Sequence, residues 1–269
     1  MITVGLDIGS GLTKGVLVED GAHLYPPKSL PTRGNPSEIG RQVLELLVEE
    51  ANLLPGDVDY VCTTGFGRYT FPDRDLQVSD ITASARGAVF LFPGTRHVVD
   101  VGAQSTRAIS VSETGRVLRF KMNEKCAAGA GRFLERCSKY LQIPLESLSE
   151  RAASAQHPKL ISSVCAVLAE TEIINHISDG VPVSEILMGV FVSLAQRART
   201  LMRYVGIQPE VTLVGGLVHN PSAVKAFEQT LELPLNVSDR AHYAAAIGAA
   251  LLGHRRLVRT SSATAPATG

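Results

Sequence analysis

The sequence predicts an α/β protein built around a duplicated strand–turn–strand unit, and three observations support this fold class. Residues 2–10 are an apolar, β-branched run that contains an Asp-Ile-Gly turn. A second run with the same pattern begins at His97 and contains Asp-Val-Gly. Several longer stretches carry apolar residues at helical spacing. A weak internal repeat of this kind is typical of a duplicated domain.

The first copy of the repeat is followed by one helix and one further strand. Residues 11–21 return as a second strand, and a hairpin closes again at Asp20-Gly21. Residues 36–53 have apolar side chains at helical spacing, and Pro55-Gly56 ends this helix. Residues 58–68 predict a strand that leaves through a Thr-Thr-Gly turn.

The second copy, residues 97–117, again predicts two strands, with a turn near Thr114-Gly115. The elements expected beyond it are a loop running into a helix at 125–143, helices at 163–178 and 185–205, a strand running into a Gly-Gly turn at 211–220, a helix at 221–231 and a small-residue helix at 242–253. The small side chains of the last helix allow close approach of another backbone.

Composition excludes several classes of function. The chain has 269 residues, enough for one large domain or two smaller ones that share a cleft. Lys and Arg (26) balance Asp and Glu (26), so no global field favours nucleic acid or an anionic membrane. No apolar stretch reaches spanning length, and Met1 leads directly into a strand-like run, so we expect neither a membrane helix nor a signal peptide. We expect a cytoplasmic protein that binds neither nucleic acid nor membrane.

The two Asp-x-Gly turns are candidate phosphate loops. Gly9 and Gly102 let backbone N–H groups point at a phosphate without a Cβ in the way. Asp7 and Asp100 suit a water-coordinated Mg²⁺, which prefers hard oxygen ligands. The further donors are Ser10, Thr13 and Lys14 in the first loop and Gln104, Ser105 and Thr106 in the second.

A third element supports nucleotide binding. Gly215 and Gly216 follow a strand, so adenine or ribose could lie flat against their backbone. Each turn alone also fits a plain hairpin. The three together, in this order and before a small-residue helix, favour an ATP site.

These segments resemble the actin, Hsp70 and sugar kinase superfamily: DIGSGLTKG its first phosphate loop, VDVGAQST its second and VTLVGGLVHN its adenosine motif. The resemblance implies two ribonuclease-H-like lobes with ATP and Mg²⁺ in the cleft between them. We expect lobes at 1–95 and 96–253, the second with cluster-binding helices, and a disordered tail at 254–269.

Two cysteine motifs narrow the resemblance. NEKCAAGAGRFLE and SSVCAVLAETEIIN resemble the ATPase activators of 2-hydroxyacyl-CoA dehydratases and the ATPase subunits of benzoyl-CoA reductase. This implies that Cys126 and Cys165, contributed by each of two subunits, hold one [4Fe-4S] cluster on the dimer axis. Both precede a helix, where the positive dipole end favours a thiolate.

The remaining cysteines have a simpler interpretation. Cys137 lies eleven residues after Cys126, about 16 Å along a continuous helix, too far to share one small cluster. Cys62 ends a core strand and is interpreted as a buried small apolar residue. Cys126 and Cys165 taken without their motifs would also fit buried thiols. Glu170 and Glu172 are interpreted as a polar helix face.

The resemblance implies an ATP-hydrolysing subunit that passes an electron from ferredoxin to a partner enzyme, because a CoA thioester accepts electrons only at very low potential. Asp7, Asp100 and Gln104 would be catalytic. Ala103 favours the small ATPase subunit of benzoyl-CoA reductase, with a homologous ATPase subunit across the cluster. TTGFGR favours a homodimeric dehydratase activator. A small-molecule kinase and a regulatory or filament protein remain as alternatives.

Overall fold

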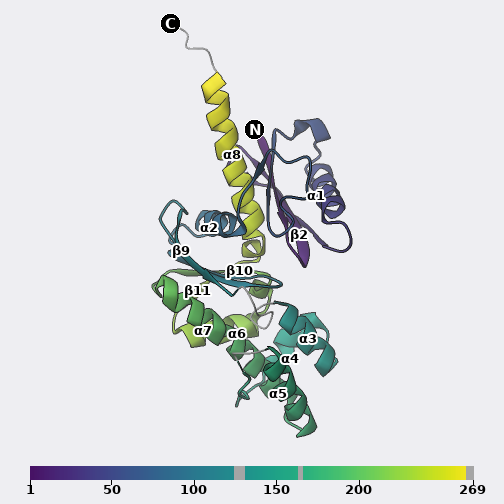
Figure 1. Ribbon diagram of the computed structural model, residues 1–269, viewed down its shortest axis with the longest axis vertical. Coiled ribbons are helices and arrows are strands. Elements are labelled where there is room, and N and C mark those ends of the chain that lie inside the picture. Colours follow the sequence, from purple (N-terminus) through teal and green to yellow (C-terminus); the bar gives the residue numbers. More distant parts are fainter. Residues whose placement is uncertain (124–130, 163–165, 265–269) are drawn as a thin grey trace. The chain divides into compact units, whose positions relative to one another are not determined.

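The computed structural model describes residues 1–123, 131–162 and 166–264, which form two compact units with one β-sheet each (Figure 1). Unit 1 comprises residues 1–93, 113–116 and the chain from Tyr243 onward; unit 2 comprises Gly94–Ser112 and Val117–His242. The α/β class expected from the sequence is confirmed. Within these ranges, no helix has the length and apolar character needed to cross a membrane.

The sheet of unit 1 is mixed, with both parallel and antiparallel strand pairs. Its strands are β1 (Ile2–Ile8), β2 (Leu12–Glu19), β3 (His23–Leu24), β4 (Lys28–Pro31), β5 (Tyr60–Thr64) and β6 (Leu76–Gln77). Its helices are α1 (Pro36–Glu50), α2 (Asp80–Leu91) and α8 (Ala244–Thr264). The strand order is β3-β2-β1-β5-β6, and β4 also pairs with β2.

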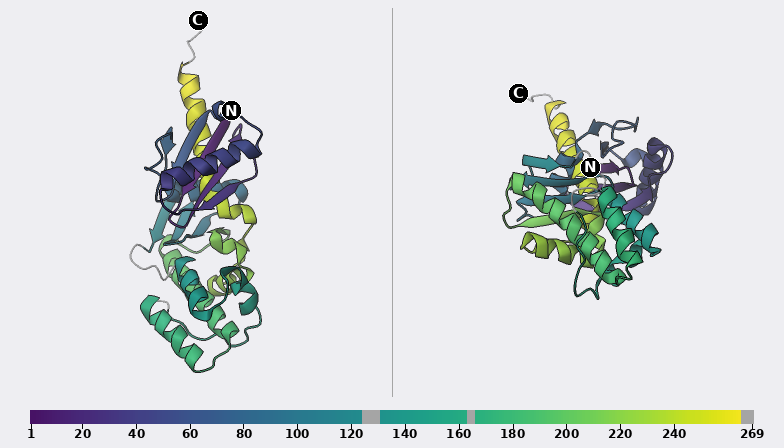
Figure 2. Two further views of the ribbon diagram at one scale, coloured as in Figure 1. Left: turned by 90° about the vertical axis from the view of Figure 1, so that its right-hand side faces the viewer. Right: turned by 60° about the horizontal axis from the view of Figure 1, so that its bottom comes forward.

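Successive side chains along the strands of the unit 1 sheet point alternately into two apolar clusters, because neighbouring residues of a strand face opposite sides of the sheet. Val4, Leu6 and Ile8 join the cluster that α1 covers, whereas Val16 and Val18 join the cluster on α8. Figure 2 shows α1 lying across one face of these strands, with α8 behind them. The amphipathic helix predicted at 36–53 therefore exists and ends slightly earlier, at Glu50.

Helix α8 packs against its neighbours by direct backbone contact. A Cβ at Gly5 would lie 2.0 Å from the Ala246 carbonyl oxygen, and one at Gly248 would meet the Ala83 carbonyl oxygen. The small-residue helix thus approaches β1 and α2 closely, as predicted. This packing assigns α8 to unit 1, whereas the sequence analysis grouped 242–253 with the second lobe.

The chain after Gly253 also differs from the expected disordered tail. Helix α8 continues to Thr264, and residues 265–269 lie outside the described ranges. A Cβ at Gly21 would lie 2.6 Å from the His254 ring, so this part of α8 packs on the β2–β3 turn. Helix α2, which was not predicted, begins where the Ser79 hydroxyl accepts a hydrogen bond from Thr82 N.

Unit 2 repeats the strand plan of unit 1. Its strands are β7 (His97–Val101), β8 (Thr106–Val111), β9 (Val117–Met122), β10 (Val211–Gly215) and β11 (Leu235–Asn236). Its helices are α3 (Gly131–Leu141), α4 (Leu148–Ala152), α5 (Ala166–Ser178), α6 (Val183–Val205) and α7 (Pro221–Leu231). The order β9-β8-β7-β10-β11 corresponds to β3-β2-β1-β5-β6, with matching directions.

The duplication extends to single residue pairs. Asp7 lies opposite Lys14 across the first hairpin, and Asp100 lies opposite Arg107 across the second. In each unit the central strand then runs parallel to a strand that ends in a glycine with positive φ, Gly65 after β5 and Gly215 in β10. The internal repeat predicted from the sequence is therefore confirmed at the level of register.

Candidate functional site

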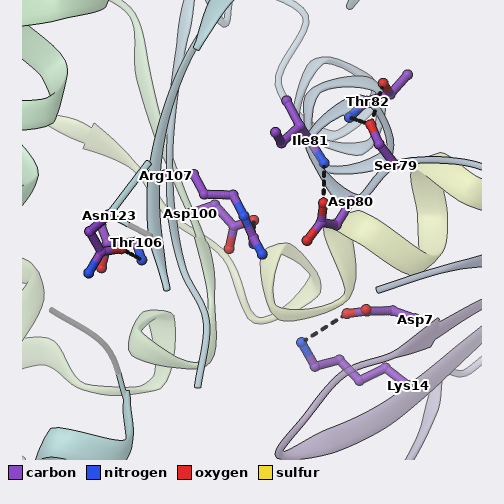
Figure 3. Close-up of polar contacts among 10 residues, drawn as sticks. All are labelled: Asp7, Lys14, Ser79, Asp80, Ile81, Thr82, Asp100, Thr106, Arg107 and Asn123. Atoms are coloured by element: carbon purple, nitrogen blue, oxygen red, sulfur yellow. Dashed lines mark hydrogen bonds and ion pairs between the residues drawn. The ribbon is translucent and has the colours of Figure 1, made fainter. Parts of the chain in front are cut away.

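The first candidate phosphate loop is the tight turn between β1 and β2. Lys14 Nζ lies 3.6 Å from Asp7 Oδ2, and both side chains are 13% exposed (Figure 3). Gly9 N donates to the Leu12 carbonyl at 3.1 Å, and a Cβ at Gly9 would lie 2.7 Å from that oxygen. The turn therefore requires glycine, and it holds an acid and a base side by side at the end of β1.

Two further residues predicted for this loop lie in different settings. Ser10 sits in the turn itself and is half-buried. Thr13 is fully buried, and its hydroxyl shares a hydrogen bond of 2.9 Å with the Thr32 hydroxyl. Direct contact between Thr13 and a phosphate would require this pair to separate, so its visible role is to tie β2 to the segment after β4.

The second candidate loop, between β7 and β8, has the same construction. Arg107 Nη1 donates to Asp100 Oδ2 at 3.0 Å, and Asp100 is 6% exposed. Gly102 N donates to the Ser105 carbonyl at 2.9 Å, which is the counterpart of the Gly9 bond. Gln104 is exposed at the tip of the turn.

Asn123 fixes the end of the second loop. Thr106 N donates to Asn123 Oδ1 at 2.6 Å, and Asn123 N donates to the Thr106 carbonyl at 3.2 Å (Figure 3). Sequence reasoning missed both Arg107 and Asn123. Aligning the two hairpins residue by residue would have found Arg107, because it occupies the position of Lys14. Asn123 carries no local signal, since its contact depends on how β9 pairs with β8.

The third element lies beside the second loop within unit 2. Gly215 pairs with Val101, and a Cβ at Gly215 would lie 2.4 Å from the Val101 carbonyl oxygen. The nearest atom to a Cβ at Gly216 is a His242 carbon at 3.9 Å, so the backbone of Gly216 is uncovered. The carboxyl ends of β7 and β10 thus bring together two of the three predicted elements.

Helix α3 begins on the second loop. Gly131 N donates to the Gly102 carbonyl at 2.9 Å, and Arg132 N donates to the Ala103 carbonyl at 2.9 Å. A helix start leaves N–H groups without intrahelical partners, and here two of them are satisfied by the loop. The segment that carries Cys126 leads into this helix. A movement of the loop backbone therefore shifts the start of α3 directly.

The proposed cluster ligands Cys126 and Cys165 lie outside the described residues. Within the described part of the chain, no group of three or more His, Cys, Asp or Glu side chains is arranged to hold a metal ion. Cys62 and Cys137 are fully buried free thiols, and burial raises the pKa of each to about 12. Both are therefore protonated at neutral pH, in agreement with their interpretation as apolar core residues.

The two helices that follow the cysteine segments are tied together by Glu170 of α5. Glu170 Oε1 lies 2.9 Å from Arg136 Nη2, and Glu170 Oε2 accepts a hydrogen bond of 3.0 Å from the Tyr140 hydroxyl. This hydrogen bond raises the pKa of Tyr140. Glu170 is only 14% exposed, so it is a link between α3 and α5 and not simply part of a polar helix face.

Ser162, just before the second cysteine segment, is held from two helices. Its N–H donates to Glu172 Oε2 of α5 at 2.5 Å. Its carbonyl accepts from Ser193 Oγ at 3.0 Å and from Arg197 Nη2 at 2.8 Å, both on α6. Glu172, like Glu170, has a specific structural partner that the sequence interpretation did not anticipate.

The two sheets and the paired Asp-x-Gly hairpins define the class of protein, a two-unit α/β protein with the actin-like fold. The chain belongs to the BadF/BadG/BcrA/BcrD ATPase family, which it matches over residues 4–253. This family membership supports ATP binding and ATP-dependent activity.

Two relatives and one solved structure illustrate the match. The chain is 36% identical over 251 residues to the 2-hydroxyisocaproyl-CoA dehydratase activator of Clostridioides difficile, covering 93% of this chain and 94% of the relative. It is 38% identical over 271 residues to one of the subunits of benzoyl-CoA reductase from Thauera aromatica, covering 96% of both. The solved activator of the Clostridium difficile dehydratase with bound ADPNP has a TM-score of 0.92, 33% identity and full coverage of both chains.

The burial of Cys62 and Cys137 predicts how the thiols react. In a Cys126→Ala/Cys165→Ala variant, the folded protein should not react with DTNB from pH 7 to pH 9, because this range lies well below the raised pKa of both thiols. Both thiols should react once the protein is unfolded in guanidinium chloride. Rapid reaction of the folded variant at pH 8 would contradict the burial of these side chains.

Proposed function

We propose that this chain is an ATP-hydrolysing subunit that activates an acyl-CoA dehydratase or reductase by ATP-driven electron transfer. Membership in the ATPase family supports ATP hydrolysis, and the names of the relatives support an acyl-CoA dehydratase or reductase as the partner. The observation that carries the coupling is the pair of hydrogen bonds from Gly131 and Arg132 to the second phosphate loop. They join the nucleotide end of unit 2 to the helix after the Cys126 segment.

At the nucleotide end, we assign roles by chemistry. Asp7 and Asp100 would hold Mg²⁺ through its waters, since each carboxylate ends a strand beside a glycine turn. Lys14 and Arg107 keep those carboxylates in place. The exposed Gln104 would position the attacking water, with Ser10 and Ser105 as phosphate donors, whereas the buried Thr13 stays bonded to Thr32.

Gly9 and Gly102 would shape the two phosphate loops: the N–H of each glycine is bonded across its own turn, to Leu12 and Ser105, so other N–H groups of the loops would face the phosphate oxygens. Gly215 and Gly216 would support the nucleoside, because the backbone of Gly216 is uncovered. In this assignment the second loop would contact the nucleotide as well as the start of α3.

At the electron end, Cys126 and Cys165 from each of two chains would hold one [4Fe-4S] cluster, which supplies a one-electron carrier when bound. Four thiolates are needed, and the buried Cys62 and Cys137 are unsuited as ligands. The Glu170 link between α3 and α5 would keep the two ligand segments of one chain in a fixed relation. The electron would arrive from ferredoxin.

Two partner enzymes are consistent with this role. Identity to the Thauera aromatica benzoyl-CoA reductase chain favours an aromatic ring as electron acceptor. In that case a homologous ATPase subunit would lie across the cluster. Identity to the dehydratase activator, and the TM-score of 0.92, favour a 2-hydroxyacyl-CoA as the substrate. In that case a second copy of this chain would lie across the cluster.

The anaerobically purified protein should be coloured and contain about four iron and four sulfide per dimer. Either Cys126→Ala or Cys165→Ala should abolish the visible absorption, because each removes two of the four ligands of a shared cluster. Cys62→Ala is the matched control and should keep it. A colourless wild type, or a cluster that survives both ligand substitutions, would refute the iron–sulfur part of the proposal.

Gly131→Pro should uncouple ATP hydrolysis from electron transfer. Proline is tolerated in the first turn of a helix, where the N–H has no intrahelical partner, so it should preserve α3 but remove the N–H that donates to Gly102. Loss of one such bond, about 1 kcal/mol, should lower the electrons transferred per ATP about fivefold. Gly131→Ala keeps the N–H, and its Cβ would have no neighbour closer than 3.4 Å, so it should behave as wild type. Equal coupling ratios in all three proteins would remove the proposed link.

The substrate is decided by assay with a purified partner. Anaerobic mixtures of this chain, ATP, reduced ferredoxin and either benzoyl-CoA reductase or 2-hydroxyacyl-CoA dehydratase catalytic subunits from the same organism should show turnover with one enzyme only. Consumption of benzoyl-CoA would select the reductase, and formation of an enoyl-CoA would select the dehydratase. Turnover with neither would reject the acyl-CoA partner.

A further inference from the structure

The segment 65–71 after β5, here named the aromatic loop, displays aromatic side chains to solvent. Phe66 is 79% exposed and Tyr69 is 60% exposed, whereas Phe71 at the end of the loop is fully buried. Single exposed apolar residues are ordinary on protein surfaces. Two aromatic rings within four residues of one loop need a more specific explanation.

The exposure of these rings does not come from a loose loop. Thr63 Oγ1 donates to the Arg68 carbonyl at 2.8 Å, Thr70 Oγ1 donates to the Gly67 carbonyl at 2.7 Å, and Arg68 Nη1 donates to the Gly65 carbonyl at 2.9 Å. The buried Phe71 anchors the far end. A binding surface that is already ordered loses less conformational entropy when a partner docks.

The aromatic loop also packs directly on the first phosphate loop, within unit 1. A Cβ at Gly65 would lie 2.5 Å from Asp7 Oδ1, and one at Gly67 would lie 2.5 Å from Ile8 Cγ2. Gly67 N donates to the Ile8 carbonyl at 2.8 Å. Movement of either loop is therefore transmitted to the other through backbone contacts.

The chemistry of the loop favours an acidic protein surface. The guanidinium of Arg68 lies 4.4 Å from the centre of the Tyr69 ring, and Nη2 donates to the Tyr69 hydroxyl at 3.2 Å. Among the described residues Arg68 has no carboxylate partner, in contrast to Arg41, which pairs with Asp73 in the same unit. Tyr and Arg are the residue types that dominate binding energy at protein interfaces.

We propose that the aromatic loop docks the catalytic partner enzyme, through an apolar pocket that receives Phe66 and Tyr69 and a carboxylate that pairs with Arg68. This rests on the proposed function, which requires such a partner. A second copy of the chain is the alternative occupant, and loss of dimerisation in the loop variants would reveal it. Docking and nucleotide binding at Asp7 are then linked, and each changes the affinity of the other by the same factor.

The test measures binding of the purified catalytic subunits, benzoyl-CoA reductase and 2-hydroxyacyl-CoA dehydratase from the same organism, to immobilised wild type and variants. Phe66→Ala/Tyr69→Ala and Arg68→Glu should each weaken binding at least about tenfold. Leu54→Ala removes another exposed apolar side chain (71%) from unit 1 and should leave binding unchanged. Thermal unfolding and the ATPase rate without partner check that each variant is folded.

The linkage between docking and nucleotide binding is measured separately, as a shift in ATP affinity. The catalytic subunits should shift the ATP affinity of the wild type and of Leu54→Ala, and this shift should disappear in the loop variants. If the wild type binds neither enzyme, the proposed function itself fails. If the wild type binds and the loop variants bind equally well, only the docking surface is refuted. Loss of dimerisation in the loop variants would instead identify a second copy as the occupant and overturn the proposal.

Discussion

Two backbone hydrogen bonds, from Gly131 and Arg132 to the carbonyls of Gly102 and Ala103, constrain the part of unit 2 on which the proposed function depends. They satisfy two N–H groups at the start of α3 with the carbonyls of a candidate phosphate loop. On its other sides the loop is fixed by the pairing of Asp100 with Arg107. Because peptide groups are the partners on both sides, the link does not depend on a flexible side chain. The loop and the start of α3 must therefore shift together.

The two units share one local geometry, a glycine at the end of the strand parallel to the central strand, but the chain that follows it differs between them. In unit 2, the chain after Gly215 forms a short 3₁₀ helix and buries Leu217 and Val218. In unit 1, the residue after Gly65 is the exposed Phe66, at the position that the exposed Gly216 holds in unit 2. Each glycine packs against the carbonyl at the end of the neighbouring central strand, so the steric requirement is common to both units. What differs is the surface that follows.

Features specified by neighbours in the sequence could be predicted, and those specified by distant contacts could not. Both hairpins and α7 follow from local turn and cap residues such as Asn220, whose side chain accepts from Ala223 N. Helix α8 was grouped with the wrong unit because its position depends on Gly5 and Gly87, far away in the chain. The role of Arg107 as the partner of Asp100 is apparent only from the pairing register of β7 and β8. Cys126 and Cys165, which lie outside the described residues, stay predictions.

The size of the available interactions limits how ATP could act on this chain. A nucleotide shifts an equilibrium only by the difference in its affinity for the two states. Changing a population from 1:10 to 10:1 requires about a hundredfold difference, or about 2.7 kcal/mol. The two bonds to α3 supply about 1–3 kcal/mol together, which leaves little to break further contacts. On the proposed mechanism, α3 and α5 should therefore move as one body, with the Arg136–Glu170 pair intact. In the proposed mechanism the nucleotide would then change the position of the cysteine segments of one chain relative to the partner chain and would preserve their spacing within the chain.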